Sequence, residues 1–381
     1  MNTLELLDRL IAFPTVSRDP NRDLIEFVRQ FLAERGIGAD LYLAEDGRKA
    51  NLFATVGPAD KPGIMLSGHT DVVPVDGQSW SKDPFRMTLA DGKAYGRGAA
   101  DMKGFLACAL RLADRATQES LATPIHFAFS HDEEIGCVGV RSMIDGLVTR
   151  AVQPRFAIVG EPTSMRIATG HKGKIAARAT CRGVTGHSAL APRALNAIYL
   201  ACDFIGSLRE QQNCIEREGP WDDDYEAPYT TLHVGRIDGG TALNIVPNRC
   251  IVDFEIRNIA QDDAGARLDS LMNEAATIAT RRREAFPQAD IGIDIFNDYP
   301  GLATPADAEV VRFVGGLVTS QHLLKVDFGT EGGLFSKRLA VPVVVCGPGS
   351  MDQGHKPDEF IALDQLEACD RMMERLLERC R

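Results

Sequence analysis

The amino-acid sequence predicts an α/β fold, in which helices flank a mostly parallel sheet, interrupted by an inserted α+β domain. Strand and helix patterns alternate over the first 170 residues, as in chains that build a parallel sheet. Several of the predicted strands end on a residue that can bind a metal or move a proton. After residues 170–173 the pattern changes to longer strands and two long helices, which indicates a separate inserted unit.

Length and composition narrow the class of protein. A chain of 381 residues exceeds what one hydrophobic core usually holds, so we expect two domains. A formal net charge of −11 repels nucleic acid and anionic membranes, so neither is an expected partner. No apolar run is long enough to span a bilayer, and the acidic N-terminal segment is unlike a secretory signal. Nine scattered cysteines without a Cys-x-x-Cys pair favour reduced thiols, which predicts a cytoplasmic protein.

The first domain is expected to comprise residues 1–173 and 285–381. Its first part should hold helices at residues 4–13, 24–35 and 105–112 and strands at 39–43, 51–56, 125–130 and 156–159, with a further strand that leads from the apolar run 64–66 to His69. In its second part, a strand at 291–296 is expected to resume the main sheet, followed by a helix opened by residues 329–333, a strand at 341–346 and a final helix at 362–378. The inserted domain, residues 174–284, should hold strands at 175–181, 229–236 and 248–257 and helices at 194–209 and 264–282.

The stretch around His69 carries the first functional signal. An apolar run precedes it, so it is predicted to be a buried parallel strand that delivers His69 to the carboxyl edge of the sheet, where ligands bind in α/β proteins. On an extended chain Asp71 projects to the same side as His69. Asp71 can therefore accept one ring N–H of His69 and leave the other nitrogen free for a metal.

Further potential ligands follow later strands or a glycine-rich turn. The full set of expected metal ligands is His69, Asp101, Glu134, Glu161 and His355. Imidazoles and carboxylates without cysteine suit Zn²⁺, Co²⁺ or Mn²⁺. Five such side chains are too many for one open catalytic zinc and fit two ions that share one carboxylate. Adjacent Glu133 and Glu134 cannot point the same way, so we expect one on a metal and the other on the attacking water.

Four motifs, in this order, resemble the dinuclear zinc aminoacylase and carboxypeptidase superfamily. They are Gly-His-Thr-Asp-Val-Val-Pro at 68–74, Gly-Arg-Gly-Ala-Ala-Asp-Met-Lys-Gly at 96–104, Asp-Glu-Glu-Ile-Gly at 132–136 and Gly-Glu-Pro-Thr at 160–163. The similarity runs essentially from end to end. Residues 14–18, 329–335, 346–350 and 355–359 are most similar to superfamily members that remove the acetyl group from N2-acetyl-L-ornithine in arginine biosynthesis. Gly332 departs from the alanine expected there.

This resemblance implies roles for the individual residues. Two Zn²⁺ ions are expected, with Co²⁺ as a substitute, and Asp101 would bridge them. His69 and Glu161 would complete one metal site, and Glu134 and His355 the other. Glu133 would be the general base, and Asp71 the partner of His69. The resemblance also implies a cis peptide between Asp101 and Met102.

The same resemblance implies that the inserted domain is a dimerisation lid. In the expected homodimer, His187 would enter the site of the partner subunit and stabilise the oxyanion. Asn244 and Arg257 would contact the carboxylate of a small N-acyl amino acid substrate. Glu331 is a candidate partner for a cationic substrate side chain.

Three functional hypotheses remain open from the sequence. The first is the deacetylation, and the second keeps its chemistry but changes the substrate to succinyl-diaminopimelate or a broad range of N-acyl amino acids. A succinyl substrate carries more carboxylates and should need more cationic residues than the sequence displays. The third is a non-catalytic binding protein on the same fold, which would have no need of Glu133 beside a complete ligand set.

Overall fold

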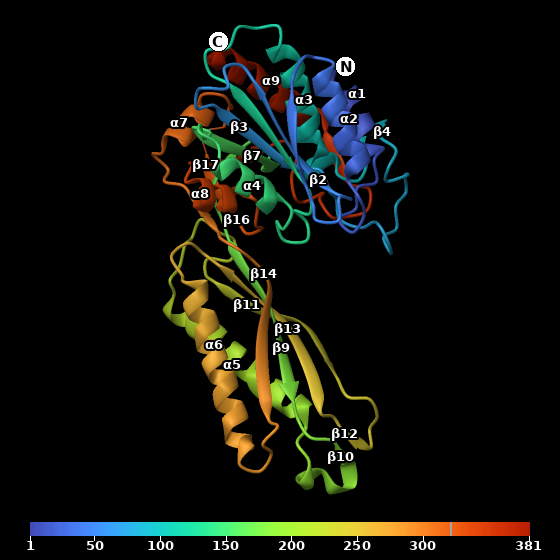
Figure 1. Ribbon diagram of the computed structural model, residues 1–381, viewed down its shortest axis with the longest axis vertical. Helices are drawn as coiled ribbons and strands as arrows, with labels where there is room; N and C mark the ends of the chain where they lie inside the picture. The colour runs from blue at the N-terminus through green and yellow to red at the C-terminus, as the bar shows by residue number, and fades with distance from the viewer. Residues whose placement is uncertain (321) are drawn as a thin grey trace. The chain divides into compact units, whose positions relative to one another are not determined.

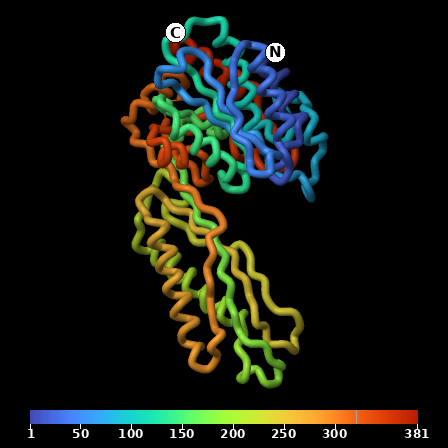
Figure 2. The backbone as a smooth tube through the Cα atoms, viewed as in Figure 1, coloured from blue at the N-terminus to red at the C-terminus, as the bar shows by residue number. Residues whose placement is uncertain are grey.

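The structure is a computed structural model, and it describes residues 1–320 and 322–381. The described chain divides into two compact units. Unit 1 comprises Met1–His171, Leu302–Lys325 and Thr330–Arg381, and unit 2 comprises Lys172–Gly301 and Val326–Gly329. The tube in Figure 2 shows the chain passing from unit 1 (blue to green) through unit 2 and back again (orange to red).

A large sheet forms the centre of unit 1 (Figure 1), with nine strands among the described residues. Its order is β1 (Ala39–Leu43), β2 (Ala50–Val56), β6 (Ile125–Ser130), β3 (Ile64–His69), β7 (Phe156–Pro162), β17 (Val343–Gly347), β8 (Ile167–His171) and β15 (Leu302–Ala303), with β16 (Leu323–Val326) also paired to β8. The central strands β6, β3, β7 and β17 run parallel. The outer pairs are antiparallel, so the predicted parallel sheet is confirmed at its centre.

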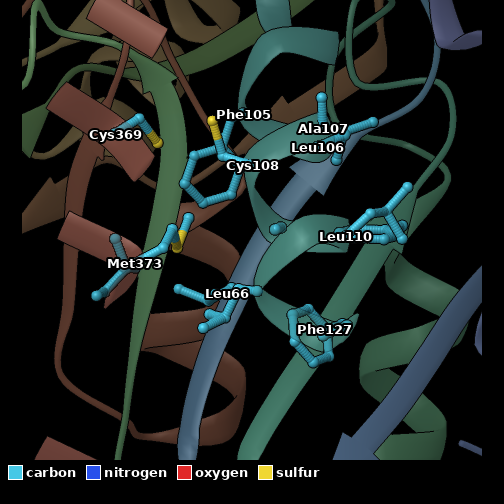
Figure 3. Close-up of a cluster of buried hydrophobic side chains, with 14 of the residues drawn as sticks. Leu66, Phe105, Leu106, Ala107, Cys108, Leu110, Phe127, Cys369 and Met373 are labelled. Atoms are coloured by element: carbon cyan, nitrogen blue, oxygen red, sulfur yellow. The ribbon is translucent and has the colours of Figure 1, made fainter. Parts of the chain in front are cut away.

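Helices cover the sheet in two groups. The first group shares one hydrophobic cluster with the sheet and consists of α1 (Thr3–Ile11), α2 (Arg22–Ala33), α3 (Gly104–Ala116), α7 (Glu309–Gly315) and α9 (Leu363–Cys380). Figure 3 draws part of this cluster, where Phe105 of α3 and Met373 of α9 lie with Leu66 of β3. The second group, α4 (Val140–Val148) and α8 (Gly332–Leu339), packs together outside that cluster. β3 and β7 are buried at every position, and each begins with an apolar run that is typical of a strand covered on both faces.

Local signals fix the helix ends that the sequence predicted. Asn2 caps α1 by accepting the backbone N–H of Glu5, whose carboxylate accepts the N–H of Asn2 in return. Gly36 follows α2 with a φ of 74°, a left-handed conformation that glycine adopts without steric cost.

A small antiparallel sheet lies beside the glycine-rich turn. It contains β4 (Thr88–Ala90), β5 (Lys93–Tyr95) and β18 (Phe360–Ala362), with β5 in the middle. After β5 the chain forms the irregular helical turn η1 (Ala99–Lys103), which carries Asp101. The expected cis peptide between Asp101 and Met102 is present.

Unit 2 is built on a four-stranded antiparallel sheet. Its order is β11 (Thr231–Gly239), β13 (Arg249–Asn258), β9 (Gly173–Arg182) and β14 (Asp290–Tyr299). The long helices α5 (Ala197–Glu218) and α6 (Ala264–Arg283) pack against it (Figure 1). A two-stranded ribbon of β10 (Gly186–His187) and β12 (Ile245–Val246) adjoins the short helix η2 (Ser188–Arg193). Among the described residues, no helix of either unit is long and apolar enough to cross a membrane.

The prediction that residues 291–296 resume the main sheet is wrong. These residues belong to β14, which pairs antiparallel with β9 in unit 2. The reason is visible in the sequence, because Ile291, Ile293 and Ile295 alternate with small or polar residues. Such alternation is typical of a half-buried antiparallel strand and not of a buried parallel one. The second boundary of the inserted unit therefore lies at residue 301 instead of 284, and residues 326–329 join it.

Gly347 provides a test of the packing at the centre of unit 1. A Cβ atom at Gly347 would lie 1.9 Å from the carbonyl oxygen of Gly160, which is backbone and cannot rotate away. We expect Gly347→Ala to lower the free energy of unfolding by about 1–3 kcal/mol, the usual cost of overpacking. Gly38→Ala is the matched control, because a Cβ there meets no atom within 4 Å. Equal urea midpoints for the two variants would contradict this packing.

Candidate metal centre

The four parallel strands of unit 1 bring the candidate ligands to one edge of the sheet. β3 ends at His69, which is in register with Ser130 at the end of β6, shortly before Glu133 and Glu134. Glu161 lies near the end of β7, where Pro162 is in register with Gly347 of β17. Neighbouring parallel strands thus supply His69, Glu161 and the glutamate pair from the edge at which α/β folds bind ligands.

Asp101 lies between two histidines. Its Oδ1 is 3.0 Å from Nε2 of His69, and its Oδ2 is 3.1 Å from Nε2 of His355. Nε2 of His69 is also 3.6 Å from Glu161, and Nε2 of His355 is 3.0 Å from Glu134. The five predicted ligands therefore come together as two groups that share one carboxylate.

The chemistry of these groups suits metal ions. The ligating atoms of His69, Asp101 and Glu134 lie within 4.8 Å of one another, as do those of His69, Glu133 and Glu161. Oε1 of Glu134 is buried without a hydrogen-bond partner among the described residues, and such an atom is costly unless a cation or water meets it. Glu133, which was expected only as a base, thus also lies close enough to His69 and Glu161 to ligate a metal ion with them.

Burial and mutual repulsion raise the pKa of several of these acids. Burial raises the pKa of Glu134 to about 7, with the charge of Asp101 adding to the rise. Burial and Asp101 also raise the pKa of Glu161. The pKa of Asp101 moves the other way because, although burial opposes it, hydrogen bonds with His355 and His69 stabilise the carboxylate. Hydrogen bonds to Asp101 and Glu134 raise the pKa of His355 to about 10.

Asp71 holds both His69 and the glutamate pair. Its backbone carbonyl oxygen is 2.9 Å from Nδ1 of His69, whereas its carboxylate is 3.6 Å away. The carboxylate instead accepts the backbone N–H groups of Glu133 and Glu134, at 3.1 and 3.2 Å, and the hydroxyl of Ser17 at 2.7 Å. The predicted pair of His69 with the Asp71 side chain is thus present at 3.6 Å, and the carbonyl oxygen of Asp71 lies closer to the ring.

Glu133 is oriented by a residue that sequence reasoning missed. The thiol of Cys137 donates a hydrogen bond to Oε1 of Glu133 over 3.2 Å. Burial raises the pKa of Glu133, and the charges of Glu134 and Glu331 add to this effect against the opposing charge of His69. A carboxylate with a raised pKa is well suited to accept and return a proton near neutral pH.

Glu331 lies at the start of α8 and is only 1% exposed. Its Oε2 accepts a hydrogen bond from the hydroxyl of Ser67 at 3.3 Å. Burial raises its pKa to about 7. Its expected contact with a cationic substrate side chain stays a prediction.

The other three candidate residues belong to unit 2. His187 and Asn244 are exposed neighbours at the β10–β12 ribbon, where Ser188 donates its N–H to the carbonyl oxygen of Asn244. Arg257 lies near the far end of β13, where its guanidinium donates to the hydroxyl of Tyr299 at 2.9 Å. β13 begins at Arg249, just after the ribbon, and at roughly 3.3 Å per residue it extends about 26 Å from there to Arg257. One copy of unit 2 therefore cannot bring both side chains to the same carboxylate.

Comparison with known proteins identifies the family. Residues 65–379 match the Peptidase family M20/M25/M40. The chain belongs to this family. It is 34% identical to an acetylornithine deacetylase of Myxococcus xanthus, over 97% of this chain and 95% of that protein. It is 32% identical to an acetylornithine deacetylase of Photorhabdus laumondii, over 98% of this chain and 96% of that protein.

Solved structures of M20 proteins share the fold. An M20 family metallo-carboxypeptidase from Sulfolobus solfataricus superposes with a TM-score of 0.78 at 18% identity, covering 99% of both chains. A dinuclear metal-binding M20 peptidase from Bacillus subtilis superposes with a TM-score of 0.67 at 16% identity, covering 99% of this chain and 97% of that one. As a member of the M20 family, this chain is a metal-dependent hydrolase. Its candidate metal ligands lie at the carboxyl edge of the parallel strands of unit 1, where α/β folds bind ligands.

The two adjacent glutamates should respond differently to the same substitution. Glu133→Gln should retain the metal content and lower kcat by roughly 10²–10⁴-fold, because it removes a proton acceptor. Glu134→Gln should instead lose metal, because it removes the carboxylate 3.0 Å from His355. Metal analysis of both purified variants beside their kinetics checks this, and equal metal loss in both would contradict the assignment within the pair.

Proposed function

We propose that this protein removes the acetyl group from N2-acetyl-L-ornithine to give L-ornithine and acetate. The observation that carries the hydrolytic mechanism is the position of Asp101, whose two carboxylate oxygens each face a different histidine. The choice of substrate is supported by the relatives named acetylornithine deacetylase, which are matched over almost their whole length. That name also supports a place in arginine biosynthesis.

Two Zn²⁺ ions, or Co²⁺ in their place, are the proposed cofactors. Asp101 would be shared, with His69 and Glu161 on one side and Glu134 and His355 on the other. Neutral imidazole and carboxylate ligands suit these ions. When bound, the ions would supply Lewis acidity that lowers the pKa of a water and offsets negative charge on the acyl oxygen.

The chain's own residues would then move the protons. Glu133 would accept a proton from the water while the water oxygen attacks the acyl carbon. Glu133 would then return this proton to the amide nitrogen as the carbon–nitrogen bond breaks. Asp71 supports this role by holding the backbone N–H of Glu133 and the ring of His69. His187 would donate to the oxyanion that forms in between.

We also propose a homodimer formed through unit 2. β11 is an edge strand of the unit 2 sheet, and the strand and the following loop expose Ile237 and Leu243. An uncovered edge strand with exposed apolar side chains is a surface suited to pairing with a second copy. In such a dimer, His187 and Asn244 of one subunit would act at the site of the other subunit. They would then lie near the Arg257 of that other subunit, although they are distant from the Arg257 of their own. Free thiols at all nine cysteines support a cytoplasmic location.

A substrate panel tests the proposed specificity. Purified protein loaded with Zn²⁺ or Co²⁺ should hydrolyse N2-acetyl-L-ornithine with a higher kcat/KM than N-acetyl-L-methionine or N-succinyl-diaminopimelate. A higher kcat/KM for the succinyl compound would favour the desuccinylase alternative. Similar values for the two acetylated amino acids would indicate a broad N-acyl-amino-acid hydrolase. No turnover of any of them, with metal bound, would favour a binding protein.

Subunit complementation tests the role of His187. His187→Ala should keep its metals and lower kcat by roughly 10²–10³-fold, the usual effect of losing one oxyanion donor. Mixed dimers of His187→Ala and Glu133→Gln subunits should recover activity, because one of their two sites would receive both intact residues. Absence of recovery in proven mixed dimers would mean that His187 does not act across the subunit boundary.

A further inference from the structure

A buried carboxylate outside the ligand set fixes the turn that presents Asp101. β18 pairs with β5, which places Glu359 beside the turn that follows β5. The carboxylate of Glu359 is 1% exposed and accepts the backbone N–H groups of Gly98, Ala100 and Asp101 at 3.0–3.1 Å. It also accepts a hydrogen bond from Nη1 of Arg97 at 2.6 Å. Four donors thus converge on one side chain and tie the backbone of Asp101 to the segment that carries His355.

Arg97 continues this network toward His355. Its guanidinium is buried and donates through Nη1 to the carbonyl oxygen of Lys356 at 3.3 Å and through Nη2 to Oε1 of Gln78. Nε1 of Trp80 donates to the same oxygen of Gln78 at 3.0 Å. With two donors on its oxygen, the amide of Gln78 has one consistent orientation, in which the NH₂ group points away from Arg97. That group donates to the carbonyl oxygen of His355 at 2.9 Å.

His355 needs such support more than the other histidine ligand does. Its backbone has a φ of 63°, a left-handed conformation that costs free energy for a non-glycine residue and persists only where surrounding contacts hold it. Its side chain is 45% exposed and it lies in a turn, outside the helices and strands. His69, by contrast, ends the buried strand β3 and is 1% exposed.

We propose that Gln78, Arg97 and Glu359 form a brace that positions His355 opposite Asp101. Gln78 is then a positioning residue of the second metal site, the one that Glu134 and His355 would complete. The brace runs without interruption from the backbone N–H of Asp101, through Glu359 and Arg97, to Gln78 and the backbone of His355. This inference rests on the proposed two-metal site. It adds that the affinity of the ion at His355 depends on a half-buried glutamine that hydrogen-bonds to the main chain of His355.

Gln78→Leu tests the brace, because leucine has a similar volume and neither donates nor accepts a hydrogen bond. Gln153→Leu is the matched control, since Gln153 is also half-buried in unit 1 and its amide donates to the carbonyl oxygens of Leu147 and Arg150. Zn²⁺ would be titrated into each metal-free protein against a competing chelator. We expect Gln78→Leu to lower the affinity for the second equivalent of Zn²⁺ by about 10-fold or more, with less effect on the affinity for the first. Losses of this size are typical when a residue that supports a metal ligand is removed. Gln153→Leu should match the wild type.

A second variant and a second measurement separate the brace from a general packing effect. Gln78→Glu keeps an oxygen for Arg97 but loses the donor to His355, so it should weaken the second equivalent as Gln78→Leu does. Hydrogen exchange of the metal-free proteins should be faster at residues 351–358 in both Gln78 variants and unchanged in Gln153→Leu.

The outcomes distinguish the brace from the site itself. Wild-type protein that binds only one equivalent would overturn the proposed two-metal site. Wild-type protein that binds two, together with Gln78 variants that bind both equivalents with wild-type affinity, would overturn the brace alone. Equal weakening of both equivalents would also overturn it, because the brace supports His355 and not His69.

Discussion

The concentration of buried negative charge at one sheet edge is the constraint on which the rest of this structure depends. Two carboxylates about 4.8 Å apart repel each other by about 3–4 kcal/mol at the effective dielectric of a protein surface. Four buried acids lie close together here, namely Asp101, Glu133, Glu134 and Glu161. Burial and mutual repulsion raise the pKa values of all of them except Asp101. Such a cluster is stable in its ionised form only beside cations. The imidazoles of His69 and His355 lie on either side of Asp101, where the two proposed ions would bind.

The fold holds these acids in place with backbone groups. Asp71 accepts the amides of Glu133 and Glu134, and Glu359 accepts those of Gly98, Ala100 and Asp101. Both carboxylates are buried beside the site without belonging to the ligand set. Each one fixes the main chain from which a ligand or the base projects. Rigid placement of this kind is what a hydrolytic site needs, because small displacements of the reacting groups cost much of the rate.

Much of the site could be predicted from sequence, because its ligands follow local signals. His69 and Glu161 lie at the ends of apolar strands, and Asp101 follows a glycine-rich turn. The parallel order of β6, β3, β7 and β17 then brings these positions together. What escaped prediction depends on pairing between distant segments. Arg97 and Glu359 lie 262 residues apart in sequence, and nothing local to either one indicates the contact.

Two further differences have similar causes. The alternating isoleucines of β14 indicate a half-buried antiparallel strand and so argue against a buried place in the main sheet, but they do not identify β9 as its partner. The backbone N–H groups of Glu133 and Glu134, which follow β6, hydrogen-bond to the carboxylate of Asp71 and fix its position. His69 then has the carbonyl oxygen of Asp71 as its nearer partner. In both cases the residues were identified correctly and their partners were decided by tertiary structure.

The central claim is that Asp101 is shared between two ions, and anomalous diffraction from crystals of the Zn²⁺-loaded protein tests it most directly. Data collected on both sides of the zinc absorption edge should give two peaks, one within bonding distance of Oδ1 of Asp101 and His69, and the other within bonding distance of Oδ2 and His355. A single peak at full Zn²⁺ occupancy, or two peaks of which only one contacts Asp101, would contradict the account.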